Sequence, residues 1–193
     1  MRSGFTNEGG YDGTTRFLKN IMGMWMLQCI HKEINKAHSF AEMAQMAAAS
    51  DYPAWVDAAD NRFMAPASML EEVKAALRDQ GAPEPRDLSD ILRAVTMGLA
   101  VCYRDSIKEM EKITGKAFTS VNIVGGGSQN VVLNQMTADV TGLPVYAGPT
   151  EGTALGNLAA QMIAAGEFAN LADFRAALPG SFDIVTYTAS RGE

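Results

Sequence analysis

Three consecutive glycines, Gly125, Gly126 and Gly127, constrain the fold of this chain more than any other feature. A short strand pattern at residues 120–124 precedes them, and a helical pattern at residues 129–141 follows. The same order then repeats, with a strand pattern at residues 143–147, a turn, and a helical pattern at residues 151–165. A series of strand, turn, helix, strand, turn and helix predicts parallel strands joined by crossover helices, and therefore an α/β fold.

The first residues predict a β-hairpin. The segments 5–11 and 14–18 flank Asp12-Gly13, a dipeptide that favours a tight turn because glycine tolerates positive φ. A hairpin alone is only marginally stable. We therefore expect it to pair with, or pack on, another part of the protein.

Helical spacing of apolar residues predicts four helices in the middle of the chain. They cover residues 20–35, 40–49, 67–80 and 88–114, and the last is the most regular. Ser39 and Glu42 form a capping-box pattern, and Gly115 ends the longest helix. The stretches 52–66 and 81–85 are predicted to be loops within one unit, so we expect residues 1–193 to form a single domain.

The glycine turn can carry chemistry. Glycines bend the backbone sharply and leave no side chain in the way of a ligand, while the N–H groups at a helix start favour anions such as phosphate. The alternative is a tight β–α turn in which the glycines only permit close packing, and the two interpretations have similar weight. The turn is not a Walker A loop, because no Lys-Ser or Lys-Thr pair follows, and it lacks the G-x-G-x-x-G spacing.

A second glycine-containing turn precedes the helical pattern at residues 151–165. Thr150 can cap this helix and Glu151 suits its first turn. A well-capped helix that packs through Gly152 and Gly156 is favoured here over direct ligand contact.

Asn20 stands where the hairpin meets the first predicted helix. Its amide can cap that helix or face a polyol, and the capping role is favoured on physical grounds. Gln28 lies about two helical turns further on approximately the same face, so both side chains can border one cleft.

Composition excludes several classes of partner. The formal net charge is −6 and there is no basic block, which argues against nucleic acid and against an anionic membrane surface.

The longest apolar-rich stretch, residues 21–30, is too short to span a bilayer, and the first residues lack the apolar core of a signal peptide. Cys29 and Cys102 are expected to be reduced, buried thiols, and no metal-binding pattern includes them. We therefore expect a cytoplasmic protein without a metal site formed by its own side chains.

Seven segments of the sequence are recognisable together, in the order 7–10, 18–28, 60–63, 124–130, 133–135, 148–151 and 154–157. In this combination they resemble the C-terminal domain of the FGGY carbohydrate kinases, and most closely those acting on L-rhamnulose. The similarity covers nearly the whole chain. The glycine turn is shared widely in the family, whereas the stretch from Leu18 to Gly23 is closer to the L-rhamnulose kinases.

The resemblance implies an actin-like, ribonuclease H-like ATPase domain with a mixed sheet flanked by helices. The implied reaction is Mg²⁺- and ATP-dependent phosphorylation of L-rhamnulose at O1, a step of rhamnose catabolism. By position, Asn20 would contact the sugar, and Gln28 and Gly126 would contact ATP. Gly125 and Gly127 would shape the same turn.

Three segments of the family pattern are not found in this sequence. Two of them belong to the N-terminal domain: the phosphate-binding hairpin, and a Gly-Ser-His-Asp-Thr-type segment that contains the general-base Asp. The third is the Ser-Gly-Thr-Trp strand that opens the C-terminal domain. We therefore expect an N-terminally truncated kinase without a catalytic residue of its own. It should be inactive alone, with an exposed sheet edge that favours association.

Two other functions fit the same residues. One is a non-catalytic nucleotide-binding remnant that binds ADP or a partner chain. The other is a kinase of the same family for xylulose, fuculose or glycerol. A purely structural role is the least favoured, because the glycine turn and the Asn20 to Gln28 stretch match the family together.

Overall fold

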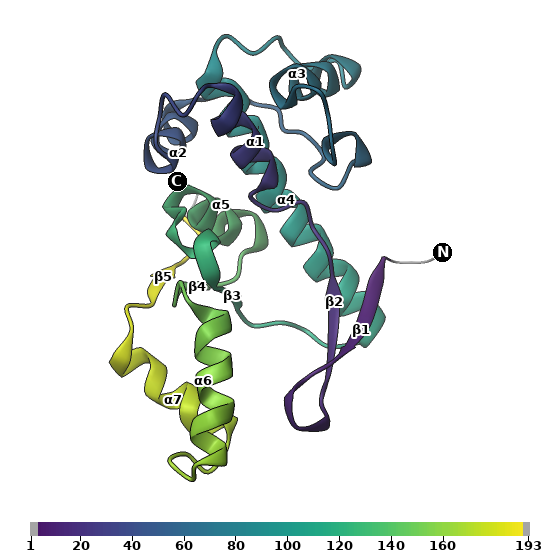
Figure 1. The fold of residues 1–193 in the computed structure, drawn as a ribbon. Coiled ribbons are helices and arrows are strands. Elements are labelled where there is room, and N and C mark those ends of the chain that lie inside the picture. Colours follow the sequence, from purple (N-terminus) through teal and green to yellow (C-terminus); the bar gives the residue numbers. More distant parts are fainter. Residues whose placement is uncertain (1–3, 191–193) are drawn as a thin grey trace. The chain divides into compact units, whose positions relative to one another are not determined.

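The computed structural model describes residues 4–190, which divide into two compact units (Figure 1). Each unit is assembled from segments that are not consecutive in the sequence. The first contains residues 4–20, 122–129 and 146–186, and the second contains residues 21–121, 130–145 and 187–190. The predicted loops at residues 52–66 and 81–85 both lie inside the second unit.

The first unit begins with the predicted hairpin. Strands β1 (Phe5–Gly9) and β2 (Thr15–Lys19) pair antiparallel, with Gly9 opposite Thr15, across a short 3-10 turn at Tyr11–Gly13. Asp12 and Gly13 both have φ in the left-handed region, at 55° and 67°. The Phe5 and Phe17 rings stack at 4.7 Å between centroids. The hairpin prediction is therefore confirmed.

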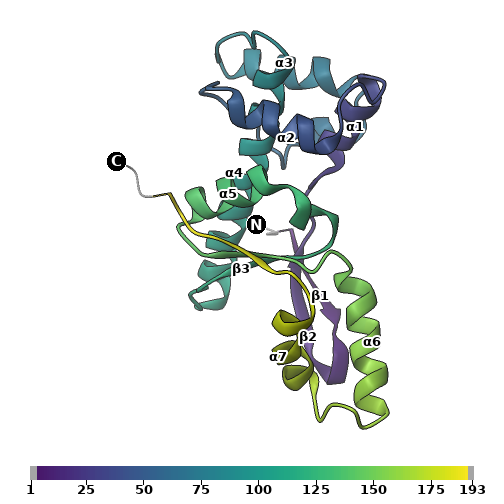
Figure 2. The same ribbon diagram turned by 90° about the vertical axis from the view of Figure 1, so that its left-hand side faces the viewer.

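Two helices complete the first unit. Helix α6 (Gly152–Ala164) and helix α7 (Leu171–Ser181) contact each other and lie side by side in both ribbon views (Figure 1 and Figure 2). Asn170 caps α7 by accepting a hydrogen bond from the N–H of Asp173 at 3.0 Å.

Strands β3 (Val121–Ile123), β4 (Val145–Ala147) and β5 (Val185–Tyr187) form a small sheet in the order β3-β4-β5. The N–H of Val121 donates to the carbonyl of Pro144 at 2.9 Å, and the N–H of Gly148 donates to that of Ile123 at 2.8 Å. The two bonds advance in the same direction along both segments, which is the pattern of parallel strands. The predicted α/β composition and the parallel pairing of these two strands are confirmed.

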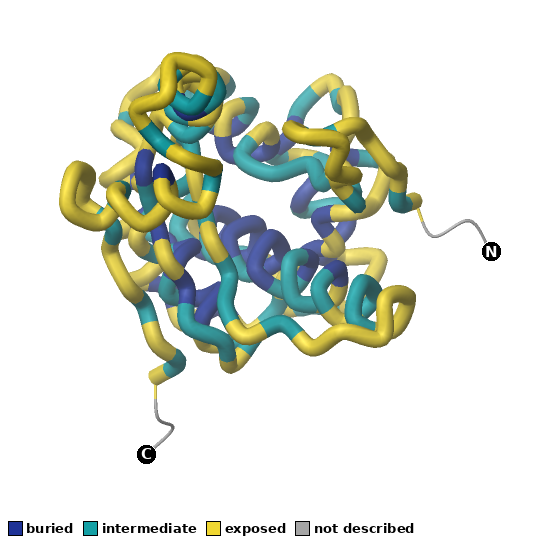
Figure 3. Tube along the Cα trace, turned by 90° about the horizontal axis from the view of Figure 1, so that it is seen from below, coloured by how far each residue is buried: buried dark blue, intermediate teal, exposed yellow. Residues whose placement is uncertain are grey.

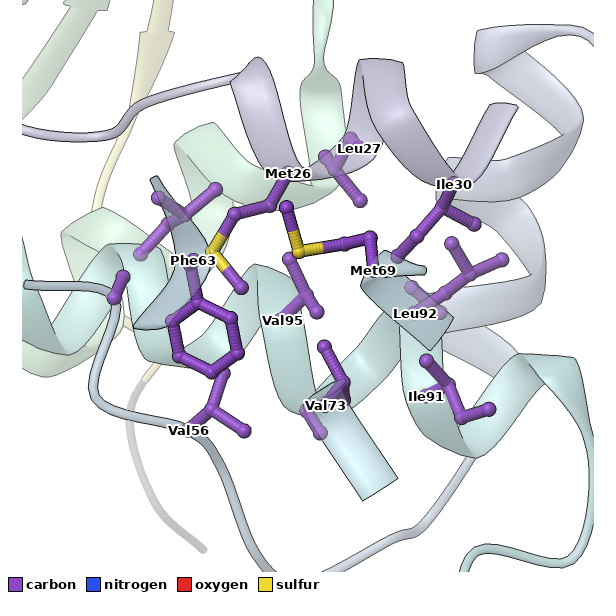
Figure 4. Close-up of a cluster of buried hydrophobic side chains, with 14 of the residues drawn as sticks. Met26, Leu27, Ile30, Val56, Phe63, Met69, Val73, Ile91, Leu92 and Val95 are labelled. Carbon is purple, nitrogen blue, oxygen red and sulfur yellow. The ribbon is translucent and has the colours of Figure 1, made fainter. Parts of the chain in front are cut away.

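The second unit is helical. Its helices are α1 (Trp25–Glu33), α2 (Phe40–Ala49), α3 (Met69–Asp79), α4 (Leu88–Thr114) and α5 (Val131–Thr141), with a 3-10 turn at Asn61–Phe63. Buried positions fall mainly on helical turns, whereas connecting loops are mostly exposed (Figure 3). The core joins apolar side chains of α1, α3 and α4 with Val56 and Phe63 from the intervening loop (Figure 4). Burial of these side chains is the main stabilising contribution.

Local signals placed several helix ends correctly. The N–H of Glu42 donates to the Ser39 hydroxyl, and the N–H of Ser39 donates to the Glu42 carboxylate at 2.6 Å, which completes the capping box. Helix α4 covers the predicted residues, and Gly115 ends it with φ at 67°. Both predictions are confirmed.

The first predicted helix is shorter than expected. It begins at Trp25 rather than near Asn20, and Met24 occupies its N-cap without a side-chain hydrogen bond. Gly23 has φ at 55°, a left-handed conformation that interrupts helical geometry before this point. The predicted capping role of Asn20 is therefore wrong.

Candidate functional site

The glycine turn forms a short 3-10 helix, Gly125–Gln129, directly before α5. Gly125 has φ at 77°, which favours glycine, and its N–H donates to the carbonyl of Pro149 at 3.2 Å. The Ser128 hydroxyl donates to the Gly125 carbonyl at 2.7 Å. Conformation and hydrogen bonding thus explain the first glycine of the three.

Gly126 has no such explanation. Its φ lies outside the left-handed region, and apart from Gly126 itself and its two chain neighbours no described atom lies within 4 Å of a Cβ built on it. A Cβ on Gly127 would meet only the Ile123 Cγ2 at 3.7 Å, an ordinary contact. Neither packing nor backbone conformation requires a glycine at 126, so the open space above it is available to a ligand.

The helix that follows the turn is capped by a side chain. Asn130 accepts a hydrogen bond from the N–H of Leu133 at 3.0 Å, and α5 begins at Val131, two residues later than predicted. The glycine turn therefore reaches the N-terminus of a helix of 11 residues, where the helix dipole favours negative charge.

The second glycine-containing turn differs from its prediction in two ways. Helix α6 begins at Gly152 with Glu151 at the N-cap and no side-chain hydrogen bond, so the capping role predicted for Thr150 is wrong. A Cβ on Gly152 would lie 3.0 Å from the Val124 Cβ, which confirms close packing there, but a Cβ on Gly156 would meet nothing within 4 Å. The predicted packing through Gly156 is therefore wrong.

Gly156 instead lines a cavity of about 610 Å³ inside the first unit. The hairpin end forms one wall and apolar side chains of α6 and α7 form another; examples are Gly10, Arg16, Leu155, Phe174 and Leu178. A second cavity of about 770 Å³ shares Val124, Pro149, Arg175 and Leu178 with the first. Both volumes lie in the range of small-molecule sites.

Arg175 lines both cavities, and no pattern in the sequence marked it as a site residue. No acidic residue lines either cavity, and within residues 4–190 Arg175 forms no ion pair. No local motif surrounds this arginine, and a helical pattern alone does not indicate which side chains face a cavity.

Asn20 and Gln28 belong to different units. Asn20 is exposed and follows β2 at the end of a segment of the first unit. Gln28 lies on the exposed side of α1 in the second unit. Their contacts with the sugar and with ATP, and the cleft that they would share, stay predictions.

Other candidate chemistry is limited in the part of the chain that the structure describes. Residues 4–190 contain no cluster of three His, Cys, Asp or Glu side chains arranged to hold a metal ion. Over the same residues, no helix combines the length and apolar character needed to cross a membrane. Cys102 is buried and Cys29 is half-buried, the two thiols are not joined in a disulfide, and burial raises the pKa of the Cys29 thiol.

Comparison with known proteins gives the family. Residues 1–165 match the model of the FGGY family of carbohydrate kinases, C-terminal domain, across segments of both units. The chain is 40% identical over 194 residues to a rhamnulokinase of Ligilactobacillus salivarius, which covers 100% of this chain and 40% of that protein. It is 42% identical over 183 residues to a rhamnulokinase of Oceanobacillus iheyensis, covering 95% of this chain and 39% of that protein. A rhamnulokinase of Bacillus subtilis is 38% identical over 189 residues, covering 97% of this chain and 39% of that protein.

The chain thus spans about 40% of the length of the curated relatives that it matches. The family match covers well over half of its 193 residues. The resemblance inferred from the glycine turn and the stretch around Asn20 is confirmed at this level. This chain belongs to the FGGY family of carbohydrate kinases and corresponds to their C-terminal domain.

Proposed function

We propose that residues 1–193 form the ATP-binding C-terminal domain of a kinase that transfers the γ-phosphate of ATP to L-rhamnulose. The observation that carries the proposal is the open space at Gly126, where neither conformation nor packing requires a glycine and an added Cβ would meet nothing within 4 Å. Relatives named rhamnulokinase at about 40% identity support the choice of sugar.

Each site residue has a role in this proposal. The turn Gly125 to Gly127 lets the nucleotide approach the backbone, and Gln28 contacts ATP from α1. Asn20, the residue directly after β2, contacts the sugar. The two units together would form an actin-like, ribonuclease H-like domain, in which the parallel pairing of β3 with β4 fits.

Magnesium would be bound mainly by the nucleotide. Mg²⁺ retains several waters and is usually held by substrate phosphates and one or two carboxylates.

Phosphoryl transfer depends on charge neutralisation and positioning from both sides of a cleft. Residues outside this sequence would supply the general-base Asp and the phosphate-binding hairpin of the N-terminal domain. We therefore expect no measurable kinase activity from residues 1–193 alone. Activity on L-rhamnulose should appear in the complete two-domain enzyme, which we expect to be cytoplasmic.

Thermal unfolding with and without Mg-ADP tests the nucleotide site. A ligand present at 100 times its Kd stabilises the folded state by about 2.7 kcal/mol, which raises Tm by roughly 5–10 °C for a domain of this size. Gly126→Val should abolish the shift without lowering Tm in the absence of ligand, because its side chain enters open space. Gly180→Val is the matched control, since a Cβ there also meets nothing within 4 Å and Gly180 belongs to α7 rather than to the turn.

An equal Mg-ADP shift in wild type and Gly126→Val would contradict the role of the turn. A second assay compares the two-domain enzyme on L-rhamnulose, xylulose, fuculose and glycerol. A higher kcat/KM for one of the other acceptors would change the assigned sugar but keep the kinase. Mg-ADP binding without phosphorylation of any of them would favour a non-catalytic nucleotide-binding module.

A further inference from the structure

The carboxylate of Glu33, the last residue of α1, lies at the N-terminus of α3. It accepts a hydrogen bond from the Ser68 hydroxyl at 2.8 Å, from the N–H of Met69 at 2.5 Å and from the N–H of Leu70 at 3.3 Å. Three donors on one helix start are thus held by one side chain from another helix.

These bonds complete the capping of α3. Ser68 itself accepts a hydrogen bond from the N–H of Glu71 at 3.2 Å. The first three N–H groups of α3, which have no partner within the helix, are therefore all satisfied, two of them by Glu33. The negative charge also suits the positive end of the α3 dipole.

Helix α1 needs such an anchor because little within it defines its position. It has nine residues and no side-chain N-cap. Shortly after its end, Asn35 and Lys36 have left-handed φ angles of 52° and 58°, so the helix does not continue. A helix this short is marginal by itself. Met26, Leu27 and Ile30 bury its inner face, but apolar contacts are not directional. The hydrogen bonds of Glu33 are directional, so they fix the rotation and axial position of α1.

Gln28 lies on the exposed side of the same helix, five residues before Glu33. A side chain near the rim of a helix lies about 5–6 Å from the axis. A rotation of α1 by about 20° therefore moves the end of Gln28 by about 2 Å, more than a catalytic contact tolerates.

We propose that Glu33 is a positioning residue for nucleotide binding, which holds Gln28 in place by fixing α1 to the start of α3. This inference rests on the proposed function, in which Gln28 contacts ATP.

The matched pair Glu33→Gln and Glu42→Gln separates positioning from stability. Both carboxylates cap a helix, but Glu42 caps α2, which carries no proposed site residue. Both variants should lower Tm. At a temperature where circular dichroism shows both to be folded, Glu33→Gln should raise the Kd for Mg-ADP about fivefold or more. Glu42→Gln should leave this Kd within about twofold of wild type.

Amide hydrogen exchange supplies a readout that needs no nucleotide. Exchange of the α1 amides should become about tenfold faster in Glu33→Gln, relative to those of α4, and should not change in Glu42→Gln. Unchanged α1 exchange in Glu33→Gln overturns the proposal. So does faster α1 exchange together with an unchanged Kd.

Gln28→Ala distinguishes failure of this inference from failure of the proposed function. If Gln28→Ala weakens Mg-ADP binding and Glu33→Gln does not, only the positioning role is wrong. If Gln28→Ala has no effect although Gly126→Val abolishes binding, the contact of Gln28 with ATP is wrong, and the role of Glu33 with it. If wild type shows no Mg-ADP shift, the same variants are measured in the two-domain enzyme as KM for ATP against kcat, where Glu33→Gln should raise KM.

Discussion

Gly98 in α4 lies directly against the backbone of Val56. A Cβ built on Gly98 would be 2.2 Å from the Val56 carbonyl oxygen and 3.2 Å from its carbonyl carbon. The N–H of Val56 also donates to the carbonyl of Ala94 at 3.4 Å, one turn earlier on the same helix. The loop that carries Val56 and Phe63 into the core therefore crosses α4 at its single glycine.

Gly98→Ala should destabilise the protein by about 1–3 kcal/mol, because the added methyl group displaces backbone rather than a flexible side chain. The measurement is the free energy of unfolding in urea. Gly156→Ala is the control, since it also replaces a glycine inside a helix but at an open position. It should stabilise the chain by up to about 1 kcal/mol through helix propensity. Equal effects of the two changes would refute the close approach at Gly98.

Asp90 should make the stability of the chain sensitive to acid. Its buried carboxylate accepts hydrogen bonds from the Nε of Arg86 at 2.8 Å and from the Ser50 hydroxyl at 2.6 Å. The bonds from Arg86 hold the pKa of Asp90 well below its ordinary value, and the Ser50 bond acts in the same direction, whereas burial opposes both. Because the folded-state pKa is depressed, this stabilisation is fully present above the unfolded-state pKa of about 3.9 and is lost as the pH falls below it.

Asp90→Asn should therefore lower the free energy of unfolding by about 2 kcal/mol at pH 7, the size expected for hydrogen bonds to a charged group. The difference from wild type should stay constant down to about pH 5 and shrink by pH 3. Urea unfolding across this range measures it, with Asp105→Asn as the control for loss of an exposed carboxylate. If the difference in free energy of unfolding between wild type and Asp90→Asn does not depend on pH, the hydrogen bonds to Asp90 do not stabilise its ionised form.

Removal of the α2 cap should have a smaller effect. Ser39→Ala deletes the acceptor of the Glu42 N–H and should cost about 1 kcal/mol, a typical value for an N-cap. Thermal unfolding followed by circular dichroism measures the change. Ser181→Ala, at the end of α7, should alter Tm little because its hydroxyl only donates to a carbonyl one turn earlier.

The chain should associate as its concentration rises. The hairpin is a two-stranded sheet, and β3 and β5 are the edges of the other sheet, so the described strands leave unpaired edges. Val124, directly after β3, and Val185, in β5, are 55% and 51% exposed. Val185→Lys should reduce the fraction of dimers and larger species in sedimentation velocity, whereas Gln161→Lys, which adds the same charge on exposed α6, should not. A concentration-independent monomer in wild type would refute the prediction.

Local sequence determined the elements whose signals lie within a few residues of each other. Asp12-Gly13 specified the hairpin, Ser39 and Glu42 the start of α2, and Gly115 the end of α4. Each of these signals is a turn conformation or a hydrogen bond between neighbours, so it does not depend on the rest of the fold.

Only the tertiary structure decided the features that depend on distant segments. Helix α1 begins at Trp25 rather than near Asn20. The hydrogen bond between Glu33 and Ser68 joins residues 35 positions apart in the sequence. The glycines also show that residue type alone does not reveal the environment. Gly152 lies close to Val124, whereas Gly126 and Gly156 face open space. Close approach, cavities and inter-helix hydrogen bonds arise when segments from separate parts of the chain come into contact. The periodicity of residues along the chain does not indicate which distant segments these are.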